Sequence, residues 1–84
     1  MELEFDALFW RHYASLTRVE QVQVNARLKL LADNLYHPSL QARRWSGPDL
    51  WYARISRDIR IFFEVYEDYY LIIDVGHHNI ERNY

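Results

Sequence analysis

The 84-residue chain contains no cysteine and only two glycines and two prolines. Without cysteine it can hold neither a disulfide framework nor a thiolate metal site, which fits a reducing compartment. The low glycine and proline content, with 50% hydrophobic and 17% aromatic residues, argues against disorder and indicates a rich core. At this length we expect one domain, spanning residues 1–84.

The chain also lacks a long apolar run, and it begins with the acidic segment MELEFD. A signal peptide needs positive charge near its start, and a membrane-spanning helix needs about 20 apolar residues. We therefore expect a soluble, cytoplasmic protein with no membrane partner.

The chain has no overall excess of positive charge, because its formal net charge is −2. The charges are nevertheless unevenly distributed. Residues 61–76 hold four acidic side chains and no basic one, whereas residues 43–60 hold five arginines against two aspartates. Such a basic strip can attract phosphate even on an acidic domain, although long-range steering is weak. The arginines are Arg43, Arg44, Arg54, Arg57 and Arg60.

The first half of the chain shows one strand pattern and two helix patterns. Apolar and acidic residues alternate at the start, as in a half-buried strand. Thr17 and Glu20 have the spacing of a capping box, and His37-Pro38 stops the helix that follows. The expected elements are a strand at 1–6, a helix from Asp6 to about Leu16 and a helix from Arg18 to about Leu35.

The second half of the chain is rich in β-branched and aromatic residues, which favour strands. Strands are expected at 40–45, 50–56, 59–66 and 69–76, with a turn at 46–49. The resulting order is βααββββ. We therefore predict an α+β fold in which two N-terminal helices pack on a mostly antiparallel sheet.

The hairpin centred near Arg57 predicts a specific register. Arg54 lies opposite Arg60, and the odd-numbered residues of 51–63 form an apolar face toward the helices. Because like charges directly opposite are unfavourable, an acid or a bound anion should lie between the arginines, and Asp74 is the expected acid. A plain solvated sheet face is the alternative reading of these arginines.

Three side chains near the C-terminus could carry chemistry. His77 and His78 can exchange protons near neutral pH, and nearby cations would lower the pKa of Tyr84. With arginine to stabilise a phosphate, they would suffice for attack by a ribose 2′-hydroxyl without a metal or cofactor. Surface polarity and a frayed tail remain alternative readings. No residue spacing indicates a metal site.

Three segments resemble the RelE/ParE superfamily of toxin–antitoxin toxins: HPSLQARRWSG, LWYARISRDIRIFFEV and DVGHHNIERNY. The resemblance covers nearly the whole chain and implies the RelE-like fold. It also implies an mRNA interferase, an endoribonuclease acting on ribosome-bound message to inhibit translation. A cognate antitoxin would be its protein partner.

The resemblance also implies roles for individual residues. Arg60 matches the phosphate-stabilising arginine of the RNA-cleaving members, and Arg54 takes the place of a catalytic lysine. Tyr52 replaces a second lysine, and His78 replaces an arginine. Tyr84 keeps the position of the tail tyrosine. The expected catalytic set is Arg60, His78, Tyr84, Arg54 and His77, and the expected RNA-binding set is Arg43, Arg44, Tyr52 and Arg57.

Two other functions remain open. A ParE-like protein would inhibit DNA gyrase without cleaving RNA, and an inactive toxin-like module would act by protein binding alone. For an antitoxin helix or strand, the sequence offers Tyr13, Tyr36, Phe62 and Tyr66 as candidate contacts.

Overall fold

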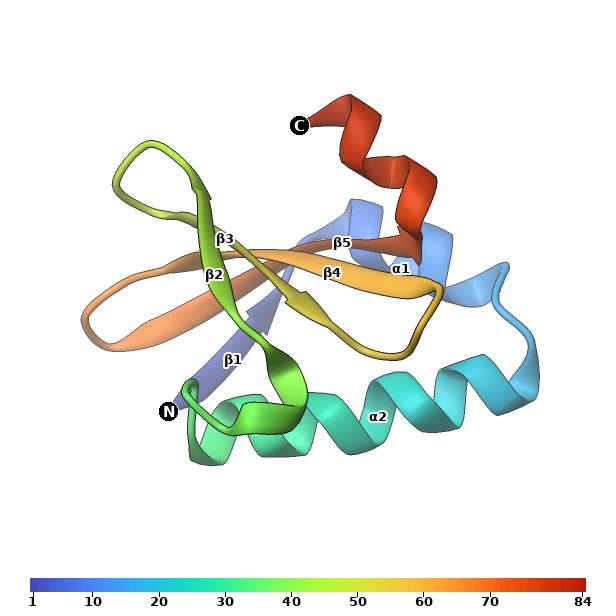
Figure 1. Ribbon diagram of the computed structural model, residues 1–84, viewed down its shortest axis with the longest axis horizontal. Helices are drawn as coiled ribbons and strands as arrows, with labels where there is room; N and C mark the ends of the chain where they lie inside the picture. Colours follow the sequence, from blue (N-terminus) through green and yellow to red (C-terminus); the bar gives the residue numbers. More distant parts are fainter.

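The computed structural model describes all residues, 1–84 (Figure 1). A strand and two helices come first, followed by four strands, and two short 3₁₀ helices complete the chain. In order, the elements are β1 (Glu2–Phe5), α1 (Ala7–Ala14), α2 (Arg18–Asp33), η1 (Pro38–Leu40), β2 (Arg43–Ser46), β3 (Leu50–Arg54), β4 (Ile59–Val65), β5 (Tyr69–His77) and η2 (His78–Asn83). The predicted α+β order βααββββ is confirmed.

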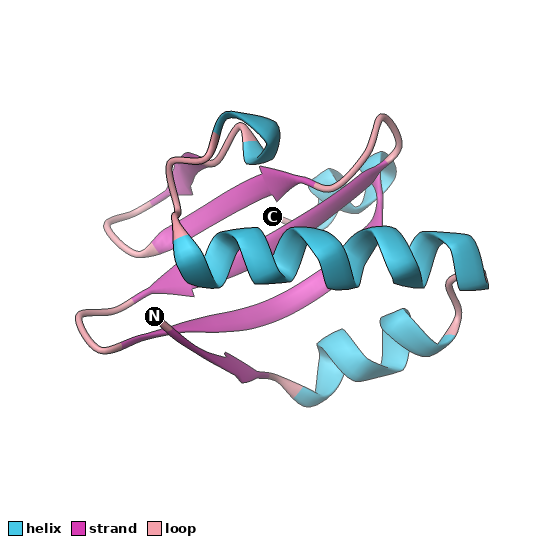
Figure 2. Cartoon of the chain, turned by 90° about the horizontal axis from the view of Figure 1, so that it is seen from below, coloured by secondary structure: helices cyan, strands magenta, loops and turns pink.

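The five strands form one mixed sheet in the order β1-β5-β4-β3-β2. β1 pairs with β5 in parallel, and the other neighbours are antiparallel. α2 crosses one face of the sheet, and η2 lies over the opposite face, which we call the outer face (Figures 1 and 2). α1 packs against β5. None of the helices combines the length and apolar character that a membrane crossing requires.

The core lies between the sheet and α2. It forms because side chains along β3 and β4 point alternately to the two faces of the sheet, and the apolar ones face α2. Arg54 pairs with Arg60 and Trp51 with Phe63, which is the predicted register. Of the seven odd-numbered side chains from residue 51 to residue 63, five are buried, Trp51 packs half-buried against them, and Arg57 is exposed in the turn. The buried five are Ala53, Ile55, Ile59, Ile61 and Phe63.

Local capping explains where the two helices start. The Asp6 side chain accepts a hydrogen bond from the Leu8 amide at the start of α1. At the start of α2, the Thr17 hydroxyl accepts from the Glu20 amide, and the Glu20 carboxylate accepts from the Thr17 amide. The predicted capping box is therefore present. It holds the Glu20 carboxylate at one end of the sheet.

Two segments differ from the expectation. Residue 40 does not begin a strand: Leu40 is fully buried at the end of η1, and β2 begins only at Arg43. The left-handed φ of Gln41, 47°, turns the chain between them. The tail after β5 is not a bare extension either, because residues 78–83 form η2.

An irregularity between β4 and β5 shifts the pairing on the outer face. Asp74 lies opposite Phe62, whereas the next residue of β4, Phe63, lies opposite Ile72. Ile73 is therefore left without a partner, as in a β-bulge. As a result Arg60 lies opposite Gly76, where the uninterrupted register would place Val75.

Candidate functional site

The outer face brings Arg54 and Arg60 side by side. Nη1 of Arg60 donates to the carbonyl oxygens of Ser56 at 2.8 Å, Arg57 at 3.2 Å and Ile59 at 3.1 Å. Nε of Arg54 donates to the same Ser56 carbonyl at 3.4 Å. These turn carbonyls offset the repulsion between the like charges and fix both guanidinium groups in place.

The acid beside this arginine pair is Glu81, and the expectation that Asp74 would fill this role is wrong. Oε2 of Glu81 in η2 lies 3.5 Å from Nε of Arg60. The physical reason is the strand register, which places Gly76 opposite Arg60 and Asp74 opposite Phe62. Gly76 lets η2 approach closely, because a Cβ at this position would lie 2.5 Å from Cγ2 of Ile80.

An aromatic cluster covers the outer face next to the arginines. Trp45 packs edge-on against Tyr52 and Phe62, with ring centroids 5.1 and 5.2 Å apart. Tyr84 stacks on Phe62 at 4.3 Å and 16°. Phe62 is thereby fully buried, so it is not available to a partner as we had expected. Arg43, which pairs with Tyr52, adds an exposed cation to this side of the sheet.

Asp74 is the buried centre of the site. Its side chain accepts three hydrogen bonds, and the residue is only 1% exposed. Oδ1 accepts from the Val75 amide at 2.8 Å and lies 2.6 Å from Nδ1 of His12. Oδ2 accepts from the Tyr84 hydroxyl at 2.6 Å. α1, β5 and the end of the chain therefore meet at one carboxylate.

The tail folds back over the sheet, but the environment of Tyr84 differs from the expectation. We expected nearby arginines to lower the pKa of its hydroxyl. Instead, burial and the hydrogen bond to the Asp74 carboxylate raise that pKa well above its ordinary value of 10.0. The phenol is therefore held neutral, which is unfavourable for a general base at neutral pH.

The two adjacent histidines lie in different surroundings. Nε2 of His77 lies 2.9 Å from Oε2 of Glu20, so this ring is tied to the start of α2. His78 is exposed at the first position of η2. No three His, Cys, Asp or Glu side chains are placed to hold a metal ion together.

The remaining expected RNA contacts are divided between the two faces. Tyr52 lies on the outer face, within the aromatic cluster. Arg44 lies opposite Trp51 on the other face, with its guanidinium 5.9 Å from the centre of that indole ring. Arg57 is exposed in the turn between β3 and β4. The structure therefore separates Arg44 from the other arginines of the basic strip.

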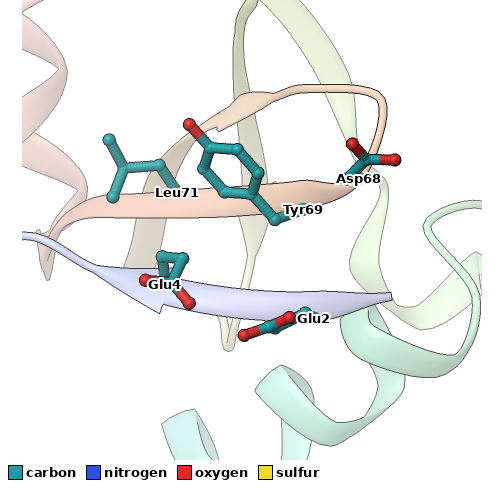
Figure 3. Close-up of a pocket in the computed structure, with 5 residues that line it drawn as sticks. All are labelled: Glu2, Glu4, Asp68, Tyr69 and Leu71. Atoms are coloured by element: carbon teal, nitrogen blue, oxygen red, sulfur yellow. The ribbon is translucent and has the colours of Figure 1, made fainter.

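The opposite end of the outer face is acidic. A hollow of about 340 Å³ lies where β1 meets the start of β5. Figure 3 shows Glu2 and Glu4 on β1 beside Tyr69 and Leu71 of β5, with Asp68 in the preceding turn. The face thus has an arginine end and a carboxylate end, and a phosphate backbone is attracted only to the former.

A second hollow, of about 290 Å³, lies at the end of the sheet between α1, β5 and η2. Both His12 and His77 line it. Sequence reasoning missed His12, because 62 residues separate it from Asp74 and no local pattern connects them.

No model of a protein family matches the chain, and no curated protein matches it either. Solved structures do match. RelE in the RelB–RelE antitoxin–toxin complex from Methanococcus jannaschii gives a TM-score of 0.79 at 15% identity, covering 96% of each chain. YafQ from E. coli gives 0.78 at 10% identity, covering 93% of each chain. The YoeB/ParE toxin from Agrobacterium tumefaciens gives 0.76 at 16% identity, covering 93% of this chain and 99% of that one. The chain has the fold of the RelE/ParE toxin superfamily.

Proposed function

We propose that the chain is the toxin of a type II toxin–antitoxin system and that it cleaves mRNA without a metal ion. The observation that carries this proposal is the arginine end of the outer face. There, Arg54 and Arg60 are fixed by turn carbonyls beside an aromatic cluster. Arginines with adjacent aromatic rings are the combination that binds single-stranded nucleic acid, through phosphate contacts and base stacking.

Arg60 is the proposed phosphate-stabilising residue. A guanidinium group that is already fixed needs little reorganisation when negative charge develops on a phosphate. In the free chain, Glu81 lies beside Arg60 as the neighbouring anion. Binding of a phosphate would replace this carboxylate, so the Glu81 side chain must turn away when RNA enters.

The proposed reaction is an internal transfer at phosphorus. The ribose 2′-oxygen loses its proton and bonds to the adjacent phosphorus, the bond to the 5′-oxygen breaks, and the 5′-oxygen takes up a proton. The products are a 2′,3′-cyclic phosphate and a 5′-hydroxyl. Arg60 and Arg54 would hold the charge on the non-bridging oxygens through this step.

The test compares Arg60→Ala with Arg18→Ala, which removes an exposed arginine of α2 on the other side of the sheet. Each purified chain is incubated with message, with and without ribosomes and in the presence of a chelator. We expect Arg60→Ala to reduce cleavage by about 10²–10³-fold and Arg18→Ala to leave it unchanged. Equal cleavage by the two variants would contradict the proposal.

The proposed partner is an antitoxin protein. Support comes from the matched toxins that were crystallised with one, RelE with RelB and YafQ with DinJ. Expression of the chain should stop growth and cut message, and co-expression of its antitoxin should restore growth. Filamentation and DNA damage with intact message would instead indicate inhibition of DNA gyrase. Healthy growth would indicate an inactive protein-binding module.

A further inference from the structure

Two histidines line the hollow at the end of the sheet, and each has one ring nitrogen next to a carboxylate. Nδ1 of His12 lies 2.6 Å from Asp74, and Nε2 of His77 lies 2.9 Å from Glu20. The other nitrogen of each ring makes no hydrogen bond within the chain. Each ring therefore has one fixed nitrogen and one that is free to exchange a proton.

The surroundings of His12 fix its tautomer. The Asp74 carboxylate already accepts from the Val75 amide and the Tyr84 hydroxyl, and an ionised carboxylate has no hydrogen to donate. Nδ1 of His12 must then carry the hydrogen, so that Nε2 of the neutral ring has a free lone pair. The His12 side chain is 40% exposed, so substrate can reach it.

The surroundings of His77 fix one of its ring nitrogens. Its carboxylate partner, Glu20, belongs to the capping box of α2 and is held there by the Thr17 amide. Nε2 of His77 is thereby held against a carboxylate whose own position is fixed. Nδ1 of His77 is therefore the nitrogen that is free to give a proton, and Nε2 of His12 is the one that is free to take one.

The hollow lies next to the β5 residue that pairs with Arg60. Gly76 lines the hollow with the two histidines, and Gly76 is the residue of β5 that pairs with Arg60. The other polar side chains that line it, Ser15, Asn79 and Asn83, can bind a ribose or a base by hydrogen bonds. A volume of about 290 Å³ is suited to one such group.

We propose that this hollow holds the ribose next to the cleaved bond, with His12 as the general base and His77 as the general acid. The inference rests on the proposed function and assigns its proton transfers. Nε2 of His12 takes the proton of the 2′-hydroxyl as the 2′-oxygen bonds to phosphorus. The bond to the 5′-oxygen breaks, and that oxygen takes a proton from Nδ1 of His77. Solvent then returns both rings to their starting forms.

The groups that face the two rings decide the pH dependence. His12 faces Asp74 on β5 and the neutral Tyr84 hydroxyl, and His77 faces Glu20 on α2. The lining residues from η2, Asn79, Ile80 and Asn83, carry no charge. A reaction that needs one neutral and one protonated imidazole has a bell-shaped pH profile.

The test measures RNA cleavage against pH for the wild-type chain, His12→Gln, His77→Gln and the control His37→Gln. We expect each of the first two variants to lose about 10²–10⁴-fold at the optimum. His12→Gln should also remove the acidic limb of the profile, and His77→Gln should remove the basic limb. His37→Gln, at the start of η1, should keep the rate and both limbs.

The outcomes separate this inference from the proposed function. Cleavage that depends on Arg60 but keeps both limbs in His12→Gln and His77→Gln would overturn the inference alone. A wild-type chain that cuts no RNA would overturn both. Should His12→Gln fail to fold, His77→Gln still decides the question, because Glu20 keeps its bond to the Thr17 amide.

Discussion

Tyr84 belongs to the site as a neutral hydrogen-bond donor that holds the end of the chain on Asp74. Tyr84→Phe keeps the ring that stacks on Phe62 but leaves a buried carboxylate oxygen without its partner. We therefore expect the free energy of unfolding at pH 7 to fall by about 1–3 kcal/mol, measured by urea denaturation. An unchanged value would mean that Asp74 does not need this bond.

The same variant should behave differently in alkali. The folded chain raises the pKa of Tyr84 above 10.0, so the stability this hydroxyl contributes is present below about pH 10 and is lost as the pH rises further. Tyr84→Phe has no hydroxyl to ionise. The difference in unfolding free energy between wild type and variant should therefore shrink above about pH 10.

Gly76 has a testable role of its own, because it lets Ile80 lie directly on β5. Gly76→Ala places a Cβ 2.5 Å from Cγ2 of Ile80, so η2 must move away from the sheet. We expect a loss of about 1–3 kcal/mol in stability and faster hydrogen exchange in residues 78–84. Gly47→Ala is the control: it strains a turn with φ 66° but has open space around it, so exchange in the tail should not change.

At the scale of elements, the capping box of α2 links helix stability to pH. The hydrogen bond from the Thr17 amide, reinforced by His77, lowers the pKa of Glu20 below its ordinary value of 4.5. Stability from the ionised carboxylate is thus present above about pH 4.5 and is lost as the pH falls further. The difference in unfolding free energy between wild type and Glu20→Gln should therefore be smaller at about pH 3 than at pH 7. An equal difference at both pH values would contradict this role.

Helices and strands that are determined by residues close together in the sequence could be predicted. Alternation with a period of two fixed the register of Arg54 with Arg60, and the spacing of Thr17 and Glu20 located the start of α2. η1 could not be predicted in this way, because Leu40 continues an apolar pattern and only tertiary burial turns it away from β2.

The site was harder to predict, because its contacts join distant segments. One unpaired residue in β5 shifts the register so that Asp74 lies opposite Phe62 and Gly76 opposite Arg60, and no sequence pattern reveals that bulge. His12 meets Asp74 only because α1 packs against β5. The arginines could be located from local strand pairing, whereas the partners of the histidines required the complete fold.

At the scale of the whole molecule, the outer face has arginines at one end and carboxylates at the other, and the arginines of β2 are divided between the two faces of the sheet. Arg43 lies on the outer face and Arg44 on the other, although they are neighbours in β2. We expect Arg43→Ala to reduce the salt dependence of RNA binding, lowering the slope of log K against log salt by about 0.7. Arg44→Ala should leave the slope unchanged, and equal effects would mean that RNA contacts both faces.

The parallel pair of β1 and β5 joins residues 2–5 to residues 69–72. During synthesis β1 can therefore form its strand pairing only after β5 has been made. Such non-local pairing is slow, because the chain loses loop entropy before the contact stabilises it. Tyr84 is made later still, so Asp74 can gain its complete set of hydrogen bonds only after residue 84 has been synthesised.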